Sequence, residues 1–256
     1  MRIICFSLKR FLCGFSLIAV ALATLVGVHF ALSAAVQIYA SKRSLPIYSV
    51  ERTDMKISIS FDCAWGSDYT DKILTCMAEN GVKCTFFAVE FWVEKNPELV
   101  KRIDGEGHEI GTHSKSHAYM SKQSETEIRE ELSSSTQAIE RIIGKKVQLF
   151  RAPYGDYNNR LIDTAKDMGL YTIQWDVDSL DWKNLSADEI AMRIVDSVQP
   201  GSIILCHNNG LHTAAALPKI FSTLKARGYE FVPIGELIYK DGYTVDHTGR
   251  QRKAAA

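Results

Sequence analysis

The chain has 256 residues with 30 basic and 30 acidic side chains, a length that suits one α/β domain of barrel size. Residues 1–52 hold six bases and one acid, which leaves 24 bases and 29 acids in residues 53–256. A mildly acidic body excludes nucleic-acid binding, because neutralising a phosphate backbone needs clustered cations.

The first predicted element is an apolar segment over residues 11–36, which holds no formally charged side chain and is long enough to cross a bilayer. The basic side chains of residues 1–10 precede it, which predicts a cytoplasmic N-terminus and export of the rest. A cleaved signal peptide is the alternative, although the segment is long for one. We therefore expect a transmembrane signal anchor, an extracytoplasmic body and a linker over residues 37–54.

Strand and helix patterns alternate along the body. The expected strands, recognised by alternating or continuous apolar residues, cover 56–61, 82–89, 108–112, 147–150, 171–177, 202–206 and 229–232. The expected helices, bounded by capping and stop signals, cover 68–80, 97–103, 124–143, 158–168, 186–198 and 217–227. This alternation predicts a parallel α/β sheet in a domain over residues 55–240, followed by a tail over 241–256.

Polar side chains capable of chemistry follow the predicted strands. They are Asp62, His113, His117, Arg151, Asp178, Asp181 and His207. In a β/α barrel the carboxyl ends of the strands converge on one mouth, where active sites lie. His113 and His117 are four residues apart, so on a helical turn both imidazoles would face the same way and could bind one metal ion.

Five motifs in this order resemble those of the NodB-type polysaccharide deacetylases, carbohydrate esterase family four. They are Ser60-Phe-Asp62, His113-Ser-Lys-Ser-His117, Arg151-Ala-Pro-Tyr-Gly155, Asp178-Ser-Leu-Asp-Trp182 and Leu205-Cys-His207. The resemblance implies a distorted (β/α)7-type barrel, preceded here by the N-terminal transmembrane helix. It also implies hydrolysis of N-acetyl groups on a cell-envelope glycan, most simply peptidoglycan. The form of the first motif is most like the PdaB-like sporulation branch.

The resemblance also implies a role for each motif residue. Asp62 is expected to be the general base held ionised by Arg151, and His207 the general acid oriented by Asp178. His113 and His117 are expected to bind a divalent metal, taken to be zinc. The remaining residues would serve the substrate and the oxyanion: Tyr154, Pro153, Asp181, Trp182 and Leu205.

The first motif departs from the family at Cys63, where the family has a second aspartate that binds the metal. The first interpretation is a weakened site completed by Asp68 or by water, and the second is a site without metal. The third is ligation by the Cys63 thiolate, which would favour zinc. A disulfide between Cys63 and Cys206 is conceivable in an exported protein but is not predicted.

Two other functions remain open at this point. The same cleft in a lapsed enzyme would make a non-catalytic glycan-binding module. An esterase acting on O-acetyl groups fits less well, because an alkoxide needs less help from the acid His207 than a leaving amine does.

Overall fold

The computed structural model of the protein describes residues 22–30, 32 and 43–254. The chain divides into two compact units, residues 1–43 and residues 44–256. In the first unit residues 22–30 are helical. Most of the predicted anchor over residues 11–36 lies outside the described residues, and among those described no helix is both long and apolar enough to cross a bilayer.

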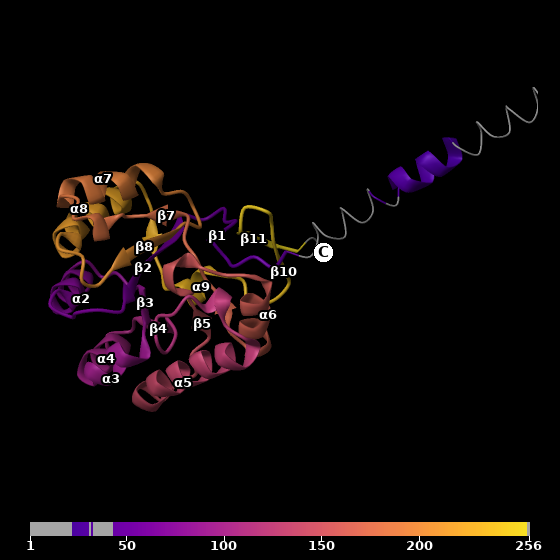
Figure 1. The fold of residues 1–256 in the computed structure, drawn as a ribbon. Helices are drawn as coiled ribbons and strands as arrows, with labels where there is room; N and C mark the ends of the chain where they lie inside the picture. The colour runs from indigo at the N-terminus through magenta and orange to yellow at the C-terminus, as the bar shows by residue number, and fades with distance from the viewer. Residues whose placement is uncertain (1–21, 31, 33–42, 255–256) are drawn as a thin grey trace, which may run out of the picture. The chain divides into compact units, whose positions relative to one another are not determined.

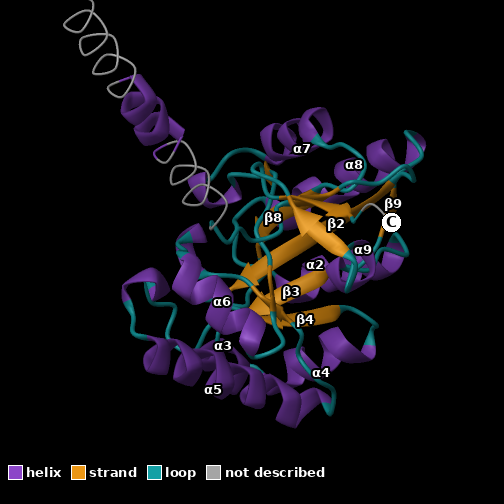
Figure 2. Cartoon of the chain, turned by 90° about the vertical axis from the view of Figure 1, so that its right-hand side faces the viewer, coloured by secondary structure: helices purple, strands orange, loops and turns teal. Residues whose placement is uncertain are grey.

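The second unit is built on one sheet of parallel strands with helices packed around its outer side (Figures 1 and 2). The strands of the sheet are β2 (Lys56–Cys63), β3 (Thr85–Ala88), β4 (Glu109–Thr112), β5 (Leu149–Phe150), β6 (Tyr171–Thr172), β7 (Val177–Asp178), β8 (Ile203–His207) and β9 (Glu230–Phe231). Their spatial order is β6-β5-β4-β3-β2-β8-β7, with β9 beside the start of β2. The expected parallel α/β architecture is confirmed, in the form of a half-barrel.

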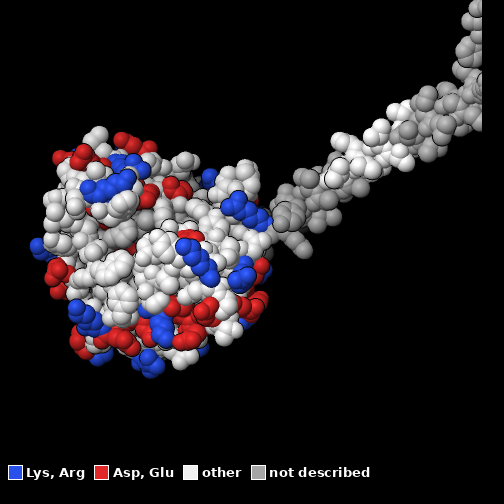
Figure 3. Space-filling model, in the orientation of Figure 1, with Lys and Arg blue, Asp and Glu red and all other residues white. Residues whose placement is uncertain are grey.

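The helices connect successive strands. They are α2 (Thr70–Glu79), α3 (Glu90–Lys95), α4 (Pro97–Gly105), α5 (Glu125–Ile143), α6 (Asn159–Asp167), α7 (Ala187–Ser197), α8 (Thr213–Ala226) and α9 (Ile234–Leu237), with short 3₁₀ turns η1 (Met120–Lys122), η2 (Pro153–Gly155) and η3 (Asp181–Lys183). Ser124 and Glu127 form a capping box at the start of α5, and this pair is one of the capping signals that predict the helix over residues 124–143. On the face shown in Figure 3, acidic and basic side chains are interspersed, and uncharged side chains make up most of its centre.

The two faces of β2 separate the core from the mouth of the barrel. Ile59, Phe61 and Cys63 are fully buried in the larger hydrophobic core. Successive strand residues point to opposite faces, so Asp62 points to the other side, where the cavity described below lies. The alternation therefore places neighbouring residues of one motif in different environments.

One predicted strand is wrong in its extent. Residues 171–177 were expected to form a single strand, but β6 pairs with β5 whereas β7 pairs with β8. The chain crosses here from one edge of the open sheet to the other. Apolar character alone cannot reveal such a crossing, because residues on both sides of it are buried: Ile173 in the smaller hydrophobic cluster and Val177 in the larger one.

The segment expected to be a linker closes the gap between those edges. Ile47 forms a parallel bridge to Ile173, and Ser49 an antiparallel bridge to Ser202. β1 (Ser49–Val50) also pairs with β11 (Arg250–Lys253), which in turn pairs with β10 (Tyr243–Val245). Residues 44–54 and most of the expected tail, 241–256, are thus part of the folded unit. The boundaries 55–240 were too narrow, since a short edge segment carries little periodicity.

A substitution at Gly201 tests how much the contact between residues 44–54 and the sheet contributes to stability. Its φ is +85°, and a Cβ there would overlap the carbonyl oxygen of Val50, whose N–H donates to the Gly201 carbonyl at 2.9 Å. We expect Gly201→Ala to lower the free energy of unfolding by about 3 kcal/mol or more in urea denaturation. Gly228 is the matched control, because its φ of +88° is similar but a Cβ there meets nothing within 4 Å. Gly228→Ala should cost only about 1 kcal/mol, and equal losses would contradict a structural role for the contact.

Candidate active site

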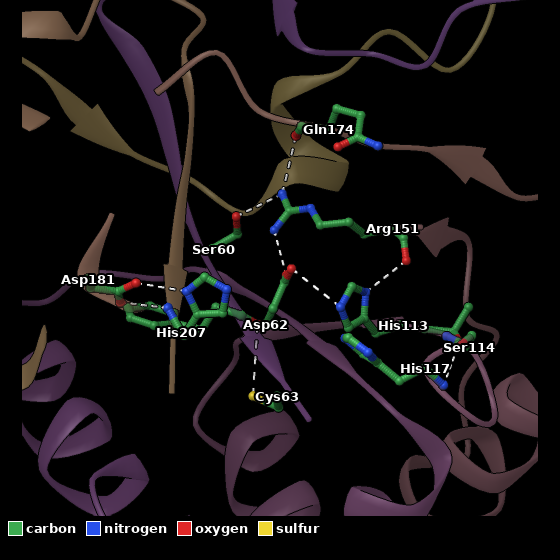
Figure 4. Close-up of polar contacts among 12 residues, drawn as sticks. Ser60, Asp62, Cys63, His113, Ser114, His117, Arg151, Gln174, Asp181 and His207 are labelled. Carbon is green, nitrogen blue, oxygen red and sulfur yellow. Dashed lines mark hydrogen bonds and ion pairs between the residues drawn. The ribbon is translucent and has the colours of Figure 1, made fainter. Parts of the chain in front are cut away.

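The motif residues converge on one cavity of about 520 Å³ at the mouth of the half-barrel. The lining residues are Asp62, Ala64, Trp65, His113, His117, Tyr154, Trp175, Asp178, Trp182, Leu205, His207 and Asn209. Figure 4 shows Asp62 at the centre, with Arg151 and His113 on one side and His207 on the other. Pro153, Asp181 and Arg151 lie behind this lining rather than in it.

Asp62 and Arg151 form a buried ion pair. Arg151 Nη1 lies 2.8 Å from Asp62 Oδ1, and Nη2 donates to Ser60 Oγ at 2.9 Å and to the Gln174 carbonyl at 3.3 Å. Burial raises the pKa of Asp62, but the charge of Arg151 and its hydrogen bond to the carboxylate are the main influences that lower it, and the pKa lies below its ordinary value. The carboxylate is therefore ionised at neutral pH and able to accept a proton.

The two histidines come together on a loop and not on the helical turn first considered. Ser114 and His117 have φ values of 75° and 58°, and no helix is formed between β4 and η1. The imidazole centroids are 4.9 Å apart. His113 Nδ1 lies 2.8 Å from the Arg151 carbonyl, so it donates there and leaves Nε2, 3.5 Å from Asp62 Oδ2, without a proton. Burial, and then His113, lower the pKa of His117 to about 4, so it is neutral at pH 7.

Glu131 holds this loop in place and was missed from the sequence. It lies on α5, nearly buried, and accepts from the Lys115 and Ser116 N–H groups at 2.9 Å each and from Ser116 Oγ at 2.6 Å. Ser114 Oγ adds a bond from the His117 N–H at 2.9 Å. A usable signal existed, because a carboxylate at the buried face of an amphipathic helix needs a partner.

The carboxylate that orients His207 is Asp181, which corrects the expectation for Asp178. Asp181 Oδ1 accepts from His207 Nδ1 at 2.7 Å, and Oδ2 accepts from the His207 N–H at 2.8 Å and from Thr213 Oγ1 at 2.6 Å. Burial lowers the pKa of His207, but Asp181 outweighs it and the pKa is raised. Asp178 lines the cavity and accepts from the Leu180 N–H at 2.9 Å. Asp178 ends β7, and the chain turns at Leu180, whose φ is 53°, before Asp181 begins η3 beside the histidine.

Tyr154 has a backbone conformation suited to the oxyanion role that was expected of it. Its φ of 60° and ψ of 7° lie in the left-handed region, which costs a non-glycine residue free energy and is commonest at functional sites. The preceding Pro153 is buried. Trp182 and Leu205 line the same cavity, as the motifs indicated.

The donor set does not complete the expected metal site. Cys63 is fully buried in the hydrophobic core, and burial raises the pKa of its thiol well above the ordinary value, so the thiolate is disfavoured. Asp68 is exposed and is not part of the cavity lining. Within the described part of the chain no three His, Cys, Asp or Glu side chains are placed to hold an ion together. The residues present supply two imidazoles but no third protein ligand. Cys63 and Cys206 are both buried free thiols.

Zinc affinity is the measurement that checks this donor set. Catalytic zinc sites use three protein ligands, so with two we expect the full-length protein, freed of metal with EDTA, to bind Zn²⁺ with a Kd weaker than about 1 μM. Isothermal titration calorimetry measures it, and His117→Ala should abolish the remaining heat. Zinc retained at one ion per chain through dialysis would show that a third ligand exists.

Comparisons with known proteins agree with this geometry. A family model described as polysaccharide deacetylase matches residues 49–173. A peptidoglycan-N-acetylglucosamine deacetylase of Bacillus cereus is 35% identical over 196 residues, which are 75% of this chain and 92% of that protein. The enzyme of the same description from Listeria monocytogenes is 35% identical over 197 residues, 77% of this chain but 42% of its own length.

A solved structure adds a different kind of relative. A CE4 family pseudoenzyme from Bacillus anthracis is 33% identical, with a TM-score of 0.73, and the match covers 76% of this chain and 69% of the other. A mutant of that pseudoenzyme is described as having restored enzymatic activity. The same fold therefore occurs both in a structure described as a peptidoglycan N-acetylglucosamine deacetylase and in one described as a pseudoenzyme.

Proposed function

The chain belongs to the polysaccharide deacetylase family, and from this premise we propose that it hydrolyses N-acetyl groups on a cell-envelope glycan, with peptidoglycan as the substrate. The observation that carries the proposal is the pairing of a base and an acid across one cavity. Asp62 and His207 both line it, and each is bonded to a buried partner of opposite charge, Arg151 or Asp181.

The proposed reaction uses these groups in sequence. Asp62 takes a proton from a water molecule while the oxygen of that water attacks the acetamide carbonyl carbon. The backbone N–H of Tyr154 stabilises the oxyanion of the tetrahedral intermediate. His207, kept protonated by Asp181, then gives its proton to the sugar nitrogen as the carbon–nitrogen bond breaks. Acetate and the free amine are the products.

Acetate release from purified peptidoglycan and from N-acetylglucosamine oligomers is the direct test, using the full-length protein with and without divalent metals. The proposal predicts acetate and new free amines in equal amounts. It fails if the protein releases no acetate from either substrate with any metal supplement.

A second candidate is a glycan-binding module without turnover, favoured by the similarity to a protein described as a pseudoenzyme. It predicts saccharide binding that is unchanged by His207→Ala, with no acetate from either protein. The intact pairs around Asp62 and His207 favour the enzyme, because a lapsed site has no need of a buried ion pair aimed at its cavity.

The cellular setting belongs to the same proposal. Export and anchoring through residues 11–36 would bring the domain to its glycan, and protease accessibility in intact cells tests this. A role in sporulation, from the PdaB-like form of the first motif, stays a prediction.

A further inference from the structure

The carboxylate that orients His207 has a second side-chain partner, Thr213. Thr213 Oγ1 donates to Asp181 Oδ2 at 2.6 Å, and both Thr213 and Asp181 are fully buried. The same carboxylate oxygen accepts from the His207 N–H at 2.8 Å, whereas Oδ1 accepts from the His207 ring at 2.7 Å. Figure 4 shows Asp181 beside that ring. Two donors thus hold Oδ2, and Oδ1 is left facing the imidazole.

The loop after β8 brings Thr213 to this place. Gly210 N–H donates to the His207 carbonyl at 3.3 Å, and Thr213 N–H donates to the Gly210 carbonyl at 3.3 Å. Helix α8 begins at Thr213, and the start of a helix favours a negative charge because its dipole is positive there. Burial raises the pKa of Asp181, but its bonds to His207 and then to Thr213 lower it, and the pKa lies below its ordinary value. The carboxylate therefore stays ionised although it is buried.

Gly210 leaves the space in which this contact forms. A Cβ at Gly210 would overlap Thr213 Oγ1 and would lie 2.9 Å from Asp181 Oδ2, which is closer than real Cβ contacts allow. Gly210 is not among the residues with positive φ, so the glycine is needed here for space and not for its backbone conformation. Any side chain at this position would push the hydroxyl and the carboxylate apart.

We propose that Thr213 is a positioning residue for the acid of the reaction. A carboxylate turns easily about its last side-chain bond, and the Thr213 hydroxyl prevents this by fixing Oδ2. Oδ1 then remains aimed at His207 Nδ1, so that the proton to be transferred is carried on Nε2 of the same ring. The proposal rests on the proposed function and deepens it, because it concerns how the acid of that site is kept in place.

The kinetic test uses acetate release from the N-acetylglucosamine tetramer. Thr213→Val keeps the shape of the side chain but removes the hydroxyl, so kcat should fall roughly tenfold, the value of one bond to a charged group. KM should change little, because the acid acts only in the transition state. Thr213→Ser keeps the hydroxyl and should restore most of kcat. Thr172→Val is the control, since Thr172 is buried and its Oγ1 has no hydrogen-bond partner within the described part of the chain; its kcat should match the parent's.

Two further variants test whether Thr213 acts through Asp181. In an Asp181→Asn background, Thr213→Val should cause no additional loss of kcat, because the hydroxyl has lost the charge that it positions. Losses that multiply would overturn the proposal. Gly210→Ala should lower kcat at least as much as Thr213→Val does. Its control is Gly105→Ala on α4, where a Cβ meets nothing within 4 Å and kcat should not change.

Proton NMR of the full-length protein measures the same effect without a substrate. A ring N–H bonded to a carboxylate gives a resonance far downfield, and the one lost in both Asp181→Asn and His207→Ala belongs to His207 Nδ1. In Thr213→Val it should move upfield or broaden through exchange with water, and in Thr213→Ser it should keep its position. If no protein releases acetate but the resonance depends on Thr213, the deacetylase proposal fails and the positioning role stands. A resonance unchanged in Thr213→Val would overturn the positioning role, whatever the activity.

Discussion

Asp62→Asn is expected to lower kcat for acetate release about 10³-fold, the range in which removing a general base falls. The amide keeps the shape of the carboxylate but cannot accept the proton of the attacking water. KM for the glycan should change much less, because the proton is transferred only in the transition state. Acetate release under saturating substrate measures the effect.

Asp68→Asn is the control for this substitution. Asp68 lies six residues further along the chain, in the loop after β2, but it is exposed and outside the cavity lining. The kcat of Asp68→Asn for acetate release should equal that of the parent protein. A comparable loss in both variants would mean that Asp62 acts through the fold and not as a base.

Asp62→Asn should also change the stability of the folded protein. It leaves the fully buried Arg151 without its counter-charge, so we expect the free energy of unfolding at pH 7 to fall by about 3 kcal/mol. The pKa of Asp62 is lower in the folded protein than in the unfolded chain. The stabilisation it provides is therefore present above the unfolded pKa of about 4 and is lost as the pH falls through the folded pKa. The difference between parent and variant should shrink in acid.

Asp181→Asn should lower kcat about 10²-fold and move the basic limb of the pH–rate profile to lower pH. Burial lowers the pKa of His207, and the bond to Asp181 is the main influence that raises it. Without the carboxylate the pKa falls, so the imidazole loses its proton at a lower pH and fewer molecules hold the acid form. A profile of kcat against pH checks both the size and the direction.

Asp178→Asn distinguishes the two aspartates of the motif. Asp178 bonds to the Leu180 N–H, and no bond joins it to the His207 ring in this structure. Its loss of kcat should be at least tenfold smaller than that of Asp181→Asn, with the basic limb close to the parent's. A larger loss of kcat in Asp178→Asn than in Asp181→Asn would instead support Asp178 as the carboxylate that orients His207.

Local signals account for what the sequence predicted well. The capping box of Ser124 and Glu127 is a contact between near neighbours, and the strand-end positions of Asp62 and His207 follow from periodicity and motif spacing. These features depend on a few adjacent residues. The sequence therefore indicated both the alternating architecture and the residues that meet at its mouth.

Features that depend on contacts between distant segments could not be predicted from the sequence. Ile47 bridges to Ile173 across the open edge of the sheet, and nothing in the pattern around Ile47 indicates that partner. The choice between Asp178 and Asp181 depends on the path of the turn between β7 and η3. Cys63 showed that a ligand was missing, but only the packing of β2 shows where its thiol goes.

The residues with a left-handed backbone conformation near the cavity predict how the protein loses activity under denaturing conditions. Among the described residues, every non-glycine residue with positive φ follows the carboxyl end of a strand: Ser114, His117, Tyr154, Leu180 and Asn184. Each such conformation costs about 1–3 kcal/mol and persists only where its surroundings enforce it. Strain is thus concentrated where the substrate would bind, and the rest of the fold must maintain it. Mild denaturant or heat should relax these loops first, so catalytic competence should disappear while the barrel is still folded.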